Sequence, residues 1–471
     1  MFRWIRFLAI VTSLVGMLIS AQADELPKPN PPNVVLLVTD DHEHDALGCA
    51  GDPMVKTPHI DHLAAEGARF ANAFCSFPVC GPARATIYTG RYPHSHGIYA
   101  NDYILPDIEI TLAEMLRDHG YQTAAIGKMH HPEHNHIQGY DYAYLRTEMR
   151  NTDRDKRINA RIEWLGPKYF AFMVGELEGP VETTVSSWIT DEALKYLDQV
   201  DSKKPFHMLV SWTRPHDPQT PPKSYADMYD PKKVVLPPNW NNRFTEALPW
   251  CPKYWPQGIQ AQYTEKQLRT YLTHYYGAIS VIDWNVGRIV DKLKKLGVYD
   301  NTLVCFIGDH GILAGHYSQI SKGPFAYDPV IGFPWIIRLP SAIPGSQVID
   351  GLVEQVDIVP TILDFCGIPI PGPFVIDGVS QKPLLTGERK TGKDAIFGEI
   401  RRICNYVRTE DAMLCWYQEG SELYDLREDP HETKNVFDKR RYAALQRRMM
   451  KRLMDWCVAT HDLSSNPKRP R

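Results

Sequence analysis

The chain has 471 residues, of which 43% are hydrophobic and 11% are aromatic. This composition excludes a disordered chain and provides for one large hydrophobic core with a smaller one beside it. The 52 lysines and arginines against 56 aspartates and glutamates give a net charge of −4, which argues against a nucleic-acid-binding protein. No stretch reaches the roughly 18 consecutive apolar residues of a membrane span, so we expect no stable membrane insertion. The nine cysteines, an odd number, argue against a disulfide scaffold and leave one cysteine as a candidate for a separate role.

Residues 1–23 have the pattern of a secretory signal peptide. Arg3 and Arg6 precede an apolar stretch over residues 7–20, and the next three residues, Ala-Gln-Ala, match the small-x-small pattern of a cleavage site. The apolar stretch is too short for a membrane anchor. We therefore expect cleavage after residue 23 and a secreted or periplasmic protein.

Strands and helices are expected to alternate from residue 34 to residue 307. Runs of β-branched and aliphatic residues predict strands buried on both faces at 34–38, 122–126, 206–212 and 302–307. Helical spacing and end signals predict helices at 57–67, 111–119, 191–200 and 267–296, the last with a break. This order predicts an α/β fold with a large, mixed but mostly parallel central sheet between helices.

From about Gly387 the pattern changes to short strands separated by polar turns. They are expected at 395–400, 405–409, 413–417 and 423–426. A basic helix over 440–456 carries an apolar face, which favours packing on this sheet over membrane binding. We expect a large N-terminal domain over 24–386 and a C-terminal α+β subdomain, an antiparallel sheet with a helix, over 387–471.

Polar side chains follow each of the four predicted parallel strands. Ligands of such sheets bind at the carboxyl ends of the strands, so we expect these side chains to form one site. Paired carboxylates also suit a divalent cation, although residues in turns and helix caps have the same composition. The residues are Asp40 and Asp41 after the first strand, Lys128 and His130 after the second, His216 after the third, and Asp309 and His310 after the fourth.

The segment Cys80-Gly81-Pro82-Ala83-Arg84 has the features of a helix start, because proline is favoured in the first helical turn. A helix N-terminus stabilises anions and lowers the pKa of a thiol. We therefore expect Cys80 to be exposed and to face an anion, with Arg84 one turn further on. The residues alone leave a reactive thiol and a buried structural cysteine equally open.

This segment, followed by Thr-Gly-Arg at residues 89–91, resembles the signature of the sulfatase family in the alkaline phosphatase superfamily. The resemblance extends in family order over residues 33–41, 57–64, 127–130, 215–216, 308–311 and 422–430. It implies an alkaline-phosphatase-like fold and hydrolysis of sulfate esters. Ala83 departs from the serine that is common in the family, but maturation chiefly needs the Cys-x-Pro-x-Arg frame.

The resemblance implies that a formylglycine-generating enzyme oxidises Cys80 to formylglycine (3-oxoalanine), whose hydrate attacks the sulfur. Arg84 and Lys128 would then orient the hydrate, and His130 would be the base near it. His216 and Lys322 would hold the sulfate and assist the leaving group. One divalent cation, Ca²⁺ or Mg²⁺, is implied, with the ligands Asp40, Asp41, Cys80 as formylglycine, Asp309 and His310.

Secretion and polar loops favour a small-molecule or carbohydrate sulfate ester as substrate. Three alternatives stay open: an aryl or choline sulfatase, a phosphomonoester or phosphonate monoester hydrolase of the same superfamily, and a non-catalytic anion- or glycan-binding relative if Cys80 is not converted. The histidine-rich stretch 130–136 is more readily explained by one active-site histidine and loop histidines than by a separate Zn²⁺ site. Aromatic residues between Trp240 and Tyr276 fit sugar-stacking walls or an ordinary core.

Overall fold

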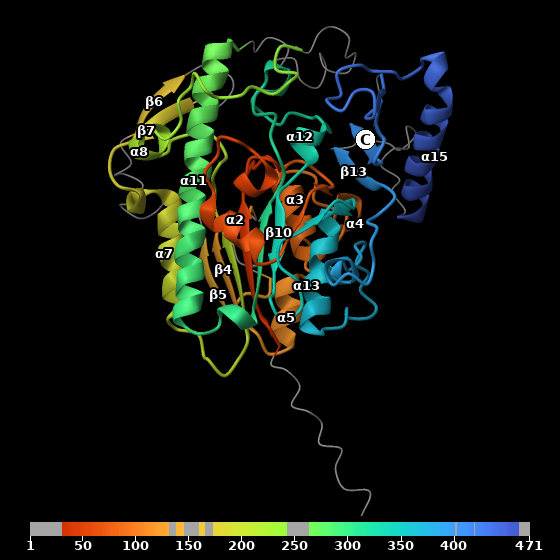
Figure 1. Cartoon of the computed structure of the whole chain (residues 1–471). Coiled ribbons are helices and arrows are strands. Elements are labelled where there is room, and N and C mark those ends of the chain that lie inside the picture. Colours follow the sequence, from red (N-terminus) through yellow and green to blue (C-terminus); the bar gives the residue numbers. More distant parts are fainter. Residues whose placement is uncertain are drawn as a thin grey trace, which may run out of the picture. The chain divides into compact units, whose positions relative to one another are not determined.

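The computed structural model describes residues 31–130, 138–145, 160–164, 173–242, 263–400, 403–418 and 420–460 (Figure 1). Residues 1–31 are a unit separate from residues 32–471, and the description below concerns the second unit. The predicted signal peptide, the histidines at 131, 134 and 136, and the aromatic residues at 250, 254 and 255 lie outside the described residues.

An eight-stranded sheet forms the centre of the fold. Five neighbouring strands, β9, β1, β8, β4 and β5, run parallel, and β10 lies antiparallel to both β9 and β2. This arrangement confirms the predicted mixed, mostly parallel sheet. In spatial order the strands are β11 (Gln347–Ile349), β2 (Ala68–Phe70), β10 (Trp335–Arg338), β9 (Thr302–Gly308), β1 (Asn33–Thr39), β8 (Phe206–Ser211), β4 (Gln122–Gly127) and β5 (Tyr142–Leu145).

Helices cover both faces of this sheet, which explains why its strands are apolar without alternation (Figure 1). In β1, Val35 and Leu37 face one layer of helices, whereas Val34 and Leu36 face the other. The first layer contains α2 (Pro58–Ala65), α7 (Val185–Leu197) and α11 (Glu265–Lys295). The second contains α3 (Cys80–Thr89), α5 (Leu112–Asp118) and α13 (Ile358–Cys366).

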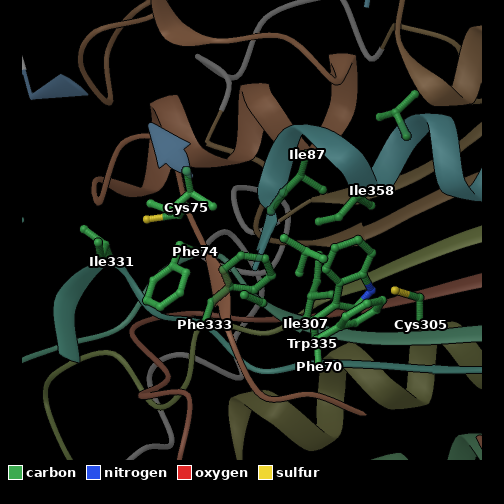
Figure 2. Close-up of a cluster of buried hydrophobic side chains, with 14 of the residues drawn as sticks. Phe70, Phe74, Cys75, Ile87, Cys305, Ile307, Ile331, Phe333, Trp335 and Ile358 are labelled. Carbon is green, nitrogen blue, oxygen red and sulfur yellow. The ribbon is translucent and has the colours of Figure 1, made fainter. Parts of the chain in front are cut away.

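Aromatic residues anchor the second layer to the sheet (Figure 2). Trp335 on β10 is fully buried, with its ring centroid 4.4 Å from that of Phe70 and 6.2 Å from that of Phe333. The sheet register pairs Trp335 with Ile307, and Figure 2 shows Ile87 of α3 in the same cluster. Because cores pack at high density, this cluster fixes α3 relative to the ends of β9 and β10.

Two predictions about helices are wrong, one of a break and one of a start. The expected break in α11 does not occur, because a helix interior tolerates glycine where packing requires it. A Cβ on Gly277 would lie 2.9 Å from Pro221, so this close approach needs glycine. α7 begins at Val185, six residues before the predicted start, because the Thr184 side chain caps it by accepting a hydrogen bond from the Ser187 amide.

The C-terminal part forms an antiparallel four-stranded sheet with a helix, as predicted. The strands are β13 (Ile396–Ile400), β14 (Cys404–Arg408), β15 (Ala412–Tyr417) and β16 (Glu422–Asp425), and the helix is α15 (Ala443–Ala459). Met449, Leu453 and Trp456 of α15 pack with Val407 and Leu414 of the sheet. The amphipathic helix therefore buries its apolar face within the chain.

Shorter elements complete the described fold. They are β3 (Ala73–Phe74), α4 (Pro93–His96), β6 (Ala160–Trp164), β7 (Met173–Leu177), α8 (Lys223–Ala226), α12 (Asp328–Ile331), β12 (Val353–Glu354) and α14 (Lys382–Leu385), with 3₁₀ turns at 48–50, 181–183, 299–301, 316–318, 355–357 and 440–442. Among the described helices, none combines the length and the apolar character that a membrane crossing requires.

Replacing Ile307 by alanine is expected to lower the free energy of unfolding by about 2–5 kcal/mol, because it leaves a cavity beside Trp335 in a fully buried layer. Urea denaturation measures the change. Val458→Ala is the matched control, since Val458 is 76% exposed and its truncation should change stability by no more than about 0.5 kcal/mol. Equal losses in the two variants would contradict the proposed core.

Candidate active site

The predicted polar residues of all four parallel strands meet at one edge of the sheet, as expected for strands that end on the same side. The Cα register pairs Thr39 with Gly308, so Asp40 and Asp309 follow at equivalent positions. The Asp309 amide donates a 3.0 Å hydrogen bond to the Thr39 carbonyl, and the Asp41 amide donates to Asp309 Oδ1 at 3.2 Å. Both Asp40 and Asp309 are completely buried.

Cys80 is the first residue of α3, which confirms the predicted helix start. The prediction that it is exposed is wrong, because Cys80 is only 1% exposed. The segment around Asn101 closes over the helix start, where the Gly81 amide donates to Asn101 Oδ1 at 2.8 Å. The sulfur lies 3.3 Å from Asp40 Oδ1 and 3.3 Å from Lys322 Nζ, so residue 80 sits between an anion and a cation.

Arg84 lies one turn further along α3 and is fully buried. Its Nε donates to Asp309 Oδ2 at 3.1 Å. One terminal nitrogen donates to the Lys128 carbonyl at 2.8 Å and to Ser211 Oγ at 2.6 Å. These contacts, from three strand ends, fix the plane of the guanidinium group.

Two lysines compensate the carboxylates that follow β1. Lys128 Nζ forms an ion pair with Asp40, and Lys322 Nζ lies 2.6 Å from Asp41 Oδ1. Only the family resemblance indicates Lys322, and the structure brings it to the same place as the strand-end residues. Its side chain is 19% exposed, so the ammonium group is also near the opening of the site.

His216 lies at the exposed side of the site. Its Nδ1 is 2.7 Å from the backbone carbonyl oxygen of Asp217, and because a carbonyl only accepts, Nδ1 carries a hydrogen. Its Nε2 lies 3.8 Å from Asp41 Oδ2, and 37% of its side chain is exposed. His310 is instead fully buried, with Nδ1 3.4 Å from Asp41 Oδ1.

The surrounding cations favour negative charge at Asp40 and at residue 80. Burial alone would raise the pKa of Asp40, but Lys128 and His216 lead the opposing charges and hold this pKa well below its usual range. Burial also opposes ionisation of the Cys80 thiol, yet Lys128 and Lys322 lower its pKa to about 6. A group at position 80 is therefore placed where an anion is stabilised.

Two histidines of the site have opposite protonation preferences. Burial lowers the pKa of His130 to about 3, and Lys128 and Arg84 act in the same direction. Burial also disfavours charge on His310, but Asp309 outweighs it and raises the His310 pKa to about 9. At neutral pH, His130 is therefore neutral, whereas His310 is protonated.

The donor atoms of this site fit a hard divalent cation. Buried carboxylates this close together are costly unless cations compensate them, and carboxylate oxygens are the ligands that Ca²⁺ and Mg²⁺ prefer. In the part of the chain that the structure describes, two overlapping groups have ligand atoms within 4.8 Å of one another: Asp40, Asp41, Cys80 and His216, and Asp40, Cys80, Asp309 and His310. All five predicted metal-binding residues fall in these groups.

Sequence reasoning missed three residues that hold this site. Ser211 accepts from Arg84, Gln355 Nε2 donates to the Asp309 carbonyl at 2.7 Å, and the Tyr275 hydroxyl donates to the Asp41 carbonyl at 2.9 Å. Tyr275 belongs to the aromatic region whose role was left open. Among its described members, Tyr263, Tyr271, Tyr275 and Tyr276 are buried in one hydrophobic cluster. The four-residue spacing of 271 and 275 indicates one helix face but not what that face contacts.

In the cation-free protein, His130 is expected to stay neutral from pH 5 to pH 9, whereas His310 stays protonated until the pH approaches about 9. The signs are opposite because burial and the neighbouring Lys128 and Arg84 lower the first pKa, whereas Asp309 outweighs burial and raises the second. NMR of ¹⁵N-labelled histidine side chains measures both, with His130→Gln and His310→Gln assigning the signals. Titration of both imidazoles near their ordinary pKa would contradict this electrostatic arrangement.

Two family models match the chain. Residues 32–368 match the model described as Sulfatase. Residues 316–458 match the model described as N-sulphoglucosamine sulphohydrolase, C-terminal. The two matches together cover the central sheet and the C-terminal sheet, and the first alone covers more than half of the chain.

Several known proteins are similar over nearly their whole length. An arylsulfatase from Clostridium perfringens is 31% identical over 87% of this chain and 91% of its own. An N-acetylglucosamine-6-O-sulfatase from Bacteroides thetaiotaomicron is 27% identical over 90% of this chain and 85% of its own. A solved structure in complex with its substrate, D-glucosamine-2-N,6-O-disulfate, has the same fold with a TM-score of 0.76 and 24% identity, over 93% of this chain and 100% of that one. The chain belongs to the sulfatase family and is a sulfuric ester hydrolase of the alkaline-phosphatase-like fold.

Proposed function

We propose that this sulfatase hydrolyses the sulfate monoester of a carbohydrate, and that residue 80 acts as formylglycine. The observation that carries the proposal is the position of Cys80. It begins α3 inside the Cys-x-Pro-x-Arg frame and contacts both Asp40 and Lys322 in one buried site. A cysteine with a purely structural role does not need this surrounding set of ionic groups.

A divalent cation, Ca²⁺ or Mg²⁺, would be held by Asp40, Asp41, Asp309, His310 and residue 80. Bound there, it would supply positive charge against the sulfate oxygens and the reacting hydroxyl. The buried carboxylates and the ligand-atom distances below 4.8 Å support this assignment. The Asp41 amide donates to the Asp309 carboxylate, and the Asp309 amide donates to the Thr39 carbonyl. These hydrogen bonds keep the carboxylates that follow β1 and β9 together.

Arg84 and Lys128 would orient residue 80 and stabilise its anionic form. Arg84 is held by Asp309 and by the carbonyl of Lys128, so its guanidinium cannot turn away. His130 would accept the proton from the hydroxyl that does not attack, since its imidazole is neutral at the working pH. Positioned dipoles and charges of this kind lower the barrier because they need no rearrangement during the reaction.

His216 and Lys322 would bind the sulfate group and the leaving-group oxygen. Both are partly exposed, with side-chain exposures of 37% and 19%. A sulfate monoester is an anion, so a cationic rim is needed to admit it beside buried carboxylates. His216 Nε2 would then supply a proton to the departing alcohol.

The proposed carbohydrate substrate rests on the relatives. The N-acetylglucosamine-6-O-sulfatase and the glucosamine disulfate complex concern sulfated amino sugars. The C-terminal family description names N-sulphoglucosamine. The arylsulfatase relative shows that the family name alone does not decide the alcohol. We infer the class of substrate, a sulfated sugar, and leave the position of the sulfate to experiment.

We further propose that residues 1–23 direct export and are removed, and that a formylglycine-generating enzyme matures residue 80. Residues 24–386 would form the catalytic domain, and residues 387–471 a subdomain that supports it. The contacts of the C-terminal sheet support this division of roles. Tyr406 OH donates to the Cys75 carbonyl at 2.5 Å, and the Glu399 amide donates to the Ser76 carbonyl at 2.9 Å.

Cys80→Ala is expected to lower turnover at least about 10³-fold, because the reacting hydroxyls are lost. The fold should persist, since alanine is smaller and the site stays buried. The Cys49→Ala variant, which changes a cysteine outside the site, is the control and should keep its activity. Mass spectrometry of the peptide spanning residues 57–91 from the native host should show that residue 80 has lost its sulfur while Cys75 keeps its thiol. An intact thiol at residue 80, or near-normal activity of Cys80→Ala, would refute the mechanism.

A panel of sulfate and phosphate esters tests the substrate class. Defined sulfated mono- and disaccharides are expected to give a kcat/KM at least about tenfold above choline sulfate and p-nitrophenyl phosphate, because the proposed substrate is the sulfate ester of a sugar, as in the amino-sugar sulfatase relative. p-Nitrophenyl sulfate serves as the reference for intrinsic reactivity. Faster turnover of the phosphate than of every sulfate would instead indicate a phosphomonoesterase.

A further inference from the structure

The turn that presents Asp41 has an unusual backbone conformation. Asp41 has φ of 59°, in the left-handed region that residues with a Cβ rarely adopt. Such a conformation persists only where surrounding contacts fix it. On one side, the Asp41 amide donates to Asp309 Oδ1 and the His42 amide donates to the His310 carbonyl.

On the other side, a single phenol closes the turn. The hydroxyl of Tyr275, from the middle of α11, donates to the Asp41 carbonyl at 2.9 Å. The same oxygen accepts a hydrogen bond from the Glu43 amide, also at 2.9 Å. Tyr275 is fully excluded from solvent, and Asp41 and Glu43 are only 3% and 8% exposed. Water therefore cannot readily replace the phenol as a hydrogen-bond partner.

We propose that Tyr275 is a positioning residue that holds the Asp41 carboxylate in the geometry for cation binding. This inference rests on the proposed function, which makes Asp41 a metal ligand. Without the hydroxyl, a buried carbonyl and a buried amide on either side of His42 lose their partner. The turn then keeps the hydrogen bonds to Asp309 and His310 but not those to Tyr275, so we expect the Asp41 backbone to relax and its carboxylate to move.

Loss of the Tyr275 hydroxyl should weaken cation binding, because other groups compete with a cation for the Asp41 carboxylate. Asp41 is held by Lys322 and lies beside His310, so its side chain has competing partners if the backbone shifts. Residues that orient metal ligands without touching the metal typically contribute about 10–100-fold to metal affinity. The Tyr275 hydroxyl donates to Asp41, a proposed ligand, and accepts from Glu43, which is not one, so its loss should weaken cation binding without removing a ligand.

Tyr275→Phe in the full-length, mature enzyme tests the proposal. After treatment with a chelator, isothermal titration with Ca²⁺, and then with Mg²⁺, should show affinity weakened about 10–100-fold. Saturating cation should restore most of the kcat. Tyr229→Phe is a matched control, because the buried Tyr229 hydroxyl also accepts a backbone hydrogen bond, from the Lys56 amide at 3.0 Å, and contacts α11 at Ser280. It should lose similar thermal stability but no cation affinity.

The outcomes separate this inference from the proposed function. If the wild-type enzyme binds Ca²⁺ or Mg²⁺, Asp41→Asn abolishes that binding and Tyr275→Phe leaves it unchanged, the positioning role is wrong and the metal site stands. Equal losses of affinity in Tyr275→Phe and Tyr229→Phe also overturn the inference, since they indicate a general structural effect. If the wild-type enzyme binds neither cation, both the inference and the metal site fail.

Discussion

The site depends on the compensation of buried negative charge. Asp40 and Asp309 lie completely within the protein, and Asp41 is nearly so. Carboxylates removed from water are costly unless cations and hydrogen bonds replace the lost hydration. Arg84, Lys128 and Lys322 provide that compensation, and each comes from a different segment of the chain. Loss of one of these cationic side chains leaves an uncompensated buried charge, so these residues act as a unit in stability.

The fold serves this charge arrangement by bringing distant segments to one edge of a rigid sheet. Parallel pairing of β1 with β9 and β8 places three strand ends together, and β4 adds a fourth. The aromatic cluster around Trp335 fixes α3, whose first residue is Cys80 (Figure 2). The C-terminal sheet contacts the backbone of Cys75 and Ser76 just before that helix. The position of residue 80 is thus determined from both sides.

The sequence predicts the fold best where a run of residues is compatible with few structures. Continuous aliphatic strands required cover on both faces, and polar residues at their ends required a shared site. Sequence reasoning was wrong about the exposure of Cys80 and about a break in α11, because both depend on remote segments that pack against the helix. Tyr275 was missed for the same reason: its partner Asp41 is 234 positions away, and no local pattern connects them. Long-range packing, not local propensity, decides such contacts.

The site has a buried part, which the fold holds in place, and a part that is open to solvent. Arg84, Lys128 and His310 are buried and contact protein groups, so their positions are fixed by the fold. His216 and Lys322 reach the surface of the site, where an ester can approach them. A sulfate group presents the same oxygens whatever alcohol carries it, so the buried part need not change between relatives that act on different esters. Discrimination among alcohols therefore falls to residues around the exposed rim, because a site that hydrogen-bonds the hydroxyls of its substrate rejects an alcohol that leaves those groups unpaired.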